Sequence, residues 1–292
     1  MSDSVSDRKH VRWGMVCMIG SLAFFTINAL LLKYLSTNVG ISPWVTLAFR
    51  ATVGLIVVKV GFSASGTVDF RRAATSKWLV ARGLFGVLGS VAYYFTVPTL
   101  GAGKATLISN FYVVIAAVLA AFFLRERITL SKIGGNVVAC CGLVLLLGVT
   151  PEELSKIGFD ECLALFGALM SAATVVVIRQ LTQTESSAMI YTTQCLYILA
   201  ASLPMAIYMR PELTMGHIVL LLIAGVSATF GQLAMTDGFR YLTVSVGGAF
   251  QVLAPMLISF GSVLCFAEAF SVVQVIGAAL ILTGCYSVIA IK

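Results

Sequence analysis

Two stretches of the chain match each other without a gap, at a fixed offset of 142 residues. The matched pairs are Gly83 with Gly225, Gly89 with Gly231, Ala92 with Ala234, Leu100 with Leu242, Glu126 with Glu268, Gly135 with Gly277 and Gly142 with Gly284. Each stretch lies in a run of five apolar segments of helix length. Because an odd number of spans reverses the chain direction, two such copies would cross a bilayer in opposite senses. The sequence therefore predicts an inverted repeat, an architecture typical of secondary transporters.

The composition indicates a protein that is solvated mainly by lipid. Of its 292 residues, 59% are apolar and 11% are charged, whereas soluble domains carry about 25% charged residues. Crossing the hydrocarbon core takes roughly 17–25 helical residues, and β-barrel strands are shorter and alternate apolar with polar residues. The predicted spans are about 13–35, 43–61, 78–98, 104–124, 133–149, 159–180, 187–208, 216–239, 243–266 and 270–290. We expect an all-α integral membrane protein with ten transmembrane helices, built from two inverted five-helix repeats at residues 1–149 and 150–292.

The basic residues predict the orientation in the membrane. With a cytoplasmic N-terminus, the inside carries Arg8, Lys9, Arg12, Lys59, Arg71, Arg72, Lys77, Arg82, Arg125, Arg127, Lys132, Arg179, Arg240 and Lys292. The outside carries Lys33, Lys104, Lys156 and Arg210, and Arg50 alone lies at depth. This positive-inside bias predicts cytoplasmic N- and C-termini in an inner or plasma membrane. It also explains the net charge of +7 without a nucleic-acid partner.

The segment from Arg82 to Gly142 resembles the EamA-type domain of the drug/metabolite transporter superfamily. The features that carry the resemblance are Leu124, Glu126 and Arg127 in the turn after span four, Gly135 in span five, and Pro255, Glu268 and Gly277 in the second copy. Arg50 in span two also fits the family pattern. Two positions depart from it: Val113 replaces a common proline, and Ala269 replaces a basic residue. The resemblance implies secondary transport of small metabolites, through a cavity lined mainly by spans 1, 3, 4, 6, 8 and 9.

Arg50 is the first candidate binding residue. A charged side chain at mid-span is costly, so it should face a polar interior and have partners there. One interpretation is an anchor for an acidic group of the substrate, or a gating contact. The other is a structural arginine that bonds backbone carbonyls or extends along its own helix.

Asp237 and Arg240 are spaced to share one face near the inner end of span eight. The simpler interpretation is an interfacial ion pair. The alternative is a carboxylate that titrates during proton-coupled exchange. No other acidic residue is predicted to lie comparably deep, so uniport, exchange and substrate-driven mechanisms stay open.

Polar residues recur at equivalent places in the two copies. Ser90 matches Gln232, and Ser109 matches Gln251, at the same offset of 142. Around a pseudo-two-fold axis these four residues would line one cavity near the midplane; the alternative is hydrogen bonding between helices. Asn110 beside Ser109, and Tyr94 near Ser90, add amide and aromatic character to the candidate cavity.

The function classes follow from these residues. We expect export of an amino acid or similar amphiphilic compound by alternating access; uptake of a larger metabolite such as S-adenosylmethionine, and a membrane sensor or scaffold, are the alternatives. An intramembrane enzyme would need a nucleophile–base pair or a metal cluster at depth. The sequence offers neither, has no CxxC or His–Cys ligand spacing, and implies no cofactor and no metal. The expected partners are a small-molecule substrate and the lipid bilayer, and both a monomer and a homodimer remain open.

Overall fold

The computed structural model describes residues 2–62, 69–126, 129–150, 152, 158–209, 212–266 and 271–290. Six residues used above lie outside these ranges: Arg127, Lys156, Arg210, Glu268, Ala269 and Lys292. Within the described part, regular secondary structure is helical, and nine segments are long and apolar enough to span a membrane. A shorter apolar helix adds Lys132–Leu147. The expectation of an all-α membrane protein of about ten helices is confirmed.

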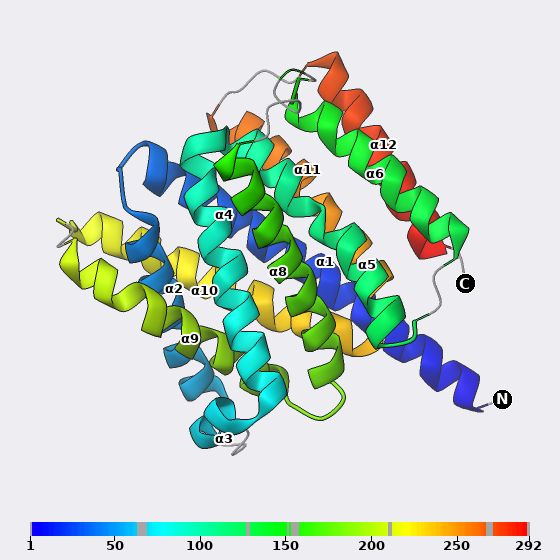
Figure 1. The fold of residues 1–292 in the computed structure, drawn as a ribbon, viewed down its shortest axis with the longest axis horizontal. Helices are drawn as coiled ribbons and strands as arrows, with labels where there is room; N and C mark the ends of the chain where they lie inside the picture. The colour runs from blue at the N-terminus through cyan, green and yellow to red at the C-terminus, as the bar shows by residue number, and fades with distance from the viewer. Residues whose placement is uncertain are drawn as a thin grey trace. The chain divides into compact units, whose positions relative to one another are not determined.

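The helices divide between two compact units, each of which draws on both halves of the sequence (Figure 1). Unit 1, Met1–Val87 and Val177–Leu242, holds α1 (Ser2–Thr37), α2 (Pro43–Phe62), α3 (Phe70–Thr75), the start of α4 (Lys77–Asn110), the end of α8 (Phe159–Leu181), α9 (Ser187–Tyr208) and α10 (Met215–Tyr241). Unit 2, Leu88–Val176 and Thr243–Lys292, holds the rest of α4 and α8, with α5 (Tyr112–Phe123), α6 (Leu130–Leu147), α11 (Val244–Phe266) and α12 (Val272–Ala290). In unit 1, α1 packs on α10 and α2 on α9.

The two predicted spans at 78–98 and 104–124 have counterparts in the structure, Lys77–Thr96 and Lys104–Phe123. The helix boundary differs, because α4 is helical without interruption over Lys77–Asn110, and the break comes at Phe111. In a straight helix, residues thirteen apart lie about 20 Å apart, yet Tyr93 Oη and Thr106 Oγ1 are 3.2 Å apart. The helix axis therefore bends back between them. Pro98 lies in that interval, and a proline removes one hydrogen bond from a helix.

The helices α6 and α12 lie side by side in unit 2 (Figure 1). A Cβ added to Gly135 would lie 2.7 Å from the carbonyl oxygen of Gly284, and a Cβ on Gly284 would lie 2.5 Å from that of Gly135. Gly142 and Gly277 approach each other in the same way, at 2.6 Å in both directions. The backbones of the two helices are therefore in contact, and the helices run antiparallel.

This contact relates equivalent positions of the two copies. Gly135 matches Gly277, and Gly142 matches Gly284, at the repeat offset. Gly135 meets Gly284, the match of Gly142, and Gly142 meets Gly277, the match of Gly135. This reciprocal pairing is the pattern of a two-fold interface. Because equivalent helices of the two copies run antiparallel, the pair has the inverted relation that the sequence predicts.

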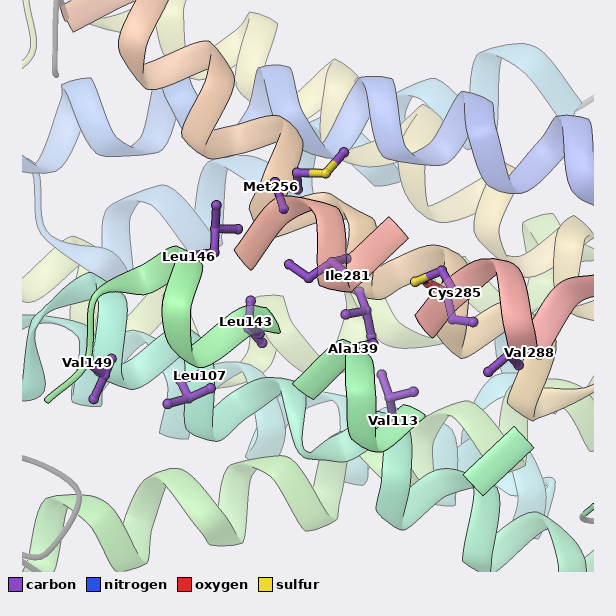
Figure 2. Close-up of a cluster of buried hydrophobic side chains, with 13 residues drawn as sticks. Leu107, Val113, Ala139, Leu143, Leu146, Val149, Met256, Ile281, Cys285 and Val288 are labelled. Atoms are coloured by element: carbon purple, nitrogen blue, oxygen red, sulfur yellow. Dashed lines mark hydrogen bonds between the residues drawn. The ribbon is translucent and has the colours of Figure 1, made fainter. Parts of the chain in front are cut away.

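A buried apolar cluster includes residues of α6 and α12, the two helices of the glycine contact (Figure 2). Its members come from α4, α5, α6, α11 and α12, and they include Leu107, Val113, Ala139, Leu143, Leu146, Met256, Ile281, Cys285 and Val288. Lipid tails are as apolar as these side chains, so close van der Waals packing drives their association. The small residues at the centre of the contact let the surrounding side chains interlock.

The glycine contact predicts a difference between two adjacent positions. Gly135→Ala would place a methyl group against the backbone of α12 and should cost about 1–3 kcal/mol, the usual penalty of overpacking. Gly134→Ala is the matched control, because a Cβ there meets nothing within 4 Å and alanine favours helix. Thermal midpoints of the purified variants in detergent provide the measurement. Equal midpoints for the two variants would contradict the backbone contact.

Candidate functional site

The predicted polar residues are distributed over both compact units. Unit 1 holds Arg50, Gln232, Asp237 and Arg240, and unit 2 holds Ser90, Tyr94, Ser109, Asn110 and Gln251. Gln232 and Gln251 are 5% and 7% exposed, so neither amide faces lipid. Ser90, Tyr94 and Ser109 are half-buried and Asn110 is buried. That Ser90, Ser109 and the two glutamines line one cavity stays a prediction.

In unit 2, the polar residues of α4 cluster around its bend. Asn110 Nδ2 donates to the Thr106 carbonyl at 2.8 Å, and Thr106 Oγ1 bonds the Tyr93 hydroxyl at 3.2 Å. The Tyr93 and Tyr94 rings meet edge to face, with centroids 6.0 Å apart. The bend therefore gathers amide, hydroxyl and aromatic groups in one place.

Glu126 lies in the turn that carries the family resemblance, and its side chain makes a structural contact in unit 2. Its carboxylate accepts the backbone N–H of Val244, with the two oxygens at 3.0 and 3.2 Å. Val244 is the first residue of α11. A negative charge is favourable at a helix N-terminus, so Glu126 joins the end of α5 to the start of α11.

Asp237 and Arg240 belong to a hydrogen-bonded group at one end of unit 1. Arg240 Nε lies 3.7 Å from Asp237 Oδ1, and both side chains are partly exposed. Arg240 Nη2 also donates to the Glu185 carbonyl at 3.0 Å, and Ser187 donates to Asp237 at 2.5 Å. This arrangement agrees with the ion-pair interpretation and ties α10 to the segment before α9.

Arg179 closes the same end of α10. Its Nη1 donates to the carbonyl oxygens of Phe239 at 2.8 Å and Arg240 at 2.6 Å. The last carbonyls of a helix have no partner within it, and cations near that end are stabilising. Arg72 adds an ion pair to Glu185 at 2.6 Å. The basic residues at this end therefore serve the structure as well as the predicted topology.

Arg50 lies on α2 in unit 1 and is half-buried. Its charge acts on Tyr191 and Cys195 of α9, and on Arg82 of α4. One turn along α2, a Cβ added to Gly54 would lie 2.8 Å from both Cys195 Sγ and Tyr191 Oη. The absence of a side chain at Gly54 thus lets α2 approach α9 closely beside Arg50.

Arg82 is a buried charged residue that the sequence interpretation did not choose as a candidate. It was counted among the basic residues on the cytoplasmic side, and its side chain is fully buried, with 0% exposure. Its Nη2 donates to Gln194 Oε1 of α9 at 2.6 Å. Arg82 comes only five residues after Lys77, about 8 Å into α4, and its burial follows from the packing of α9 against it.

The glycines around Arg82 carried the missed signal. A Cβ on Gly83 would lie 2.5 Å from the Tyr197 ring, so this glycine admits α9 closely. A Cβ on Gly86 would lie 2.6 Å from Arg82 Nη1, so the guanidinium fills the space that a larger side chain would take. In the sequence, an arginine followed closely by Gly83 and Gly86 was therefore the available sign of a buried guanidinium.

No group of three or more His, Cys, Asp or Glu residues in the described ranges is placed to hold a metal ion. The polar groups around Arg82 are instead the Gln194 amide, the Tyr191 hydroxyl and the charge of a second guanidinium, Arg50. Such a set can donate hydrogen bonds to an anion and offers no metal ligand set.

The chain is similar to one protein family, to two named exporters and to a protein of known structure. The family model of the EamA-like transporter family matches residues 12–148 and 159–290. The chain is 22% and 23% identical to the "Pseudopaline exporter CntI" of Pseudomonas aeruginosa, strains UCBPP-PA14 and PAO1, over 93% of each chain. A protein of known crystal structure is 19% identical and superposes with a TM-score of 0.79, covering 94% of this chain and 96% of its own. That likeness concerns the fold alone.

Proposed function

The chain belongs to the EamA-like transporter family, and we propose that it is a secondary transporter that exports a small organic metabolite by alternating access. The observation that carries the proposal is the doubled family match, once in each half of the chain. The antiparallel glycine contact of α6 and α12 supports it, because inverted repeats are the basis of alternating access in many secondary transporters.

The direction of transport rests on the relatives. Both are named as exporters, which favours export over uptake. The proposed substrate is an amino acid or a similar amphiphilic compound. The positive-inside bias supports a protein in the inner or plasma membrane with both termini in the cytoplasm.

The proposed substrate-binding residues are Ser90, Ser109, Gln232 and Gln251, and Tyr94, Asn110 and Arg50 are further candidates. Their support is the equivalence of the two serine–glutamine pairs at one offset, together with the burial of both glutamines. Buried amides that face away from lipid are the expected lining of a polar site in a membrane protein.

Flux in a purified system tests the proposal. A panel of amino acids and amphiphilic metabolites is first screened for thermal stabilisation, since a ligand stabilises the state to which it binds. The compound that stabilises is then used in counterflow, in which labelled compound should accumulate only in vesicles that contain the protein and unlabelled compound. Stabilisation without counterflow would instead identify a sensor or scaffold. Cells that express the chain should also release preloaded compound faster than cells that lack it.

The cavity proposal predicts that replacing either glutamine weakens substrate binding and leaves the thermal stability nearly unchanged. Gln232→Leu and Gln251→Leu should each weaken binding of the stabilising compound, because its polar group then meets an apolar side chain. Their thermal midpoints without ligand should change little, since a hydrogen bond between membrane helices contributes only about 0.6 kcal/mol on average. Titrating the compound against each variant gives both quantities. Lower stability with unchanged affinity would show that the amides only tie helices together.

A further inference from the structure

The Arg82 guanidinium is buried with only part of its hydrogen-bonding capacity used. Nη2 donates to Gln194 Oε1 at 2.6 Å, while Nε and Nη1 have no hydrogen-bond partner among the described residues. The side chain is 0% exposed. Arginine stays protonated in proteins, so it carries a full charge and N–H donors on both of these nitrogens. A buried charge of this kind normally requires an acceptor.

The charges around Arg82 do not supply that acceptor. Among the described residues, the groups that act on it electrostatically are Arg50, Cys195 and Tyr191, and none of them is a carboxylate. The Tyr191 hydroxyl bonds Thr229 Oγ1 at 3.2 Å. The Arg50 guanidinium adds a second positive charge that repels the first. Arg82 therefore keeps two donor nitrogens without an acceptor among the described residues, beside an amide and in the field of a second cation, which favours a bound anion.

We propose that Arg82, Gln194 and Arg50 form a binding site for a carboxylate group of the transported metabolite, closed in the conformation described here. The proposal rests on the proposed transport function and specifies the chemistry of its substrate. A carboxylate is planar and matches the guanidinium fork with two acceptor oxygens. A phosphate would bring a second negative charge, whose desolvation costs more.

The local packing holds this site in place. Gly86 leaves the space that Nη1 occupies, and a Cβ there would also lie 3.5 Å from Cγ of Gln194. Gly54 allows α2, which carries Arg50, to lie against Cys195 and Tyr191. Residues of three helices, α2, α4 and α9, thus make up the proposed site, and opening of the helices would admit the ligand.

The first test uses acids and their neutral counterparts as probes. Succinate and L-glutamate should raise the thermal midpoint of the purified chain in a concentration-dependent way, at constant ionic strength balanced with chloride. Succinamide, the neutral counterpart of succinate in which both carboxylates are amides, should raise it much less. Equal shifts with the acids and with phosphate or chloride would overturn the assignment to a carboxylate, and so would the absence of any shift with the acids.

Gln194→Glu is the sharpest variant, because it places a carboxylate where Gln194 Oε1 meets Arg82. It should raise the thermal midpoint without ligand and abolish the further shift with succinate or L-glutamate. If Arg82 only ties α4 to α9, the midpoint rises but the acid-dependent shift persists, and this result would refute the site.

Arg82→Lys provides a second variant, since lysine keeps the charge and loses the planar fork. It should raise the acid concentration for half-maximal shift about tenfold or more, the loss expected for one charged hydrogen bond. The matched control is Arg71→Gln, which removes a charge from an exposed side chain on α3 and should leave the acid response unchanged. An unchanged response in Arg82→Lys as well would count against the site.

The outcome separates the two proposals. Counterflow of a neutral metabolite, without any acid-dependent shift, would keep the transport function and refute the carboxylate site. An acid-dependent shift that Gln194→Glu abolishes, in a chain that catalyses no counterflow, would keep the site and refute transport.

Discussion

Hydrocarbon offers no hydrogen bonds, so every buried polar group in this chain must find its partner within the protein or in a ligand. Most do so visibly. Asn28 Nδ2 donates to the Ala224 carbonyl at 2.8 Å, Arg179 bonds the last carbonyls of α10, and Glu126 accepts the first N–H of α11. Among the described residues, Arg82 is the charged exception, because its Nε and Nη1 lack a partner; single buried oxygens of Asn136, Thr174 and Thr192 also lack one. We infer the chemistry of the substrate from Arg82, since a transporter needs a polar position that its substrate completes.

The lipid environment also explains why glycines are important for the packing of these helices. With no hydrophobic driving force between helices in lipid, close approach supplies the association energy. The reciprocal contacts of Gly135 with Gly284, and of Gly142 with Gly277, bring two backbones together in unit 2. Equivalent contacts also recur in the two units: Gly231 lies against Phe25, and its match Gly89 lies against Ser171. The repeat in sequence is thus a repeat of contacts, made between helices that come from different halves of the chain.

The sequence predicted what depends on periodicity and spacing, and it failed where three-dimensional packing decides. The spans, the doubled glycines and the importance of the turn at Glu126 follow from apolar length and a constant offset. The two spans at 78–98 and 104–124 were predicted, but the apolar pattern did not give the helix boundary, since α4 continues through its bend to Asn110. Arg82 was counted on the cytoplasmic side and was not chosen as a candidate, because distance from the helix start does not give burial; α9 covers it through Gln194 and Tyr197. The composition of the compact units was equally beyond reach, since chain order does not reveal which helices pack together.

The most direct test of the account is an experimental structure of the chain in a lipid nanodisc with succinate or L-glutamate bound. The account predicts a carboxylate oxygen within about 2.7–2.9 Å of Nε or Nη1 of Arg82, the usual distance of a charge-assisted hydrogen bond, with Gln194 still beside it. A carboxylate bound elsewhere, while Arg82 still donates to Gln194 alone, would contradict it.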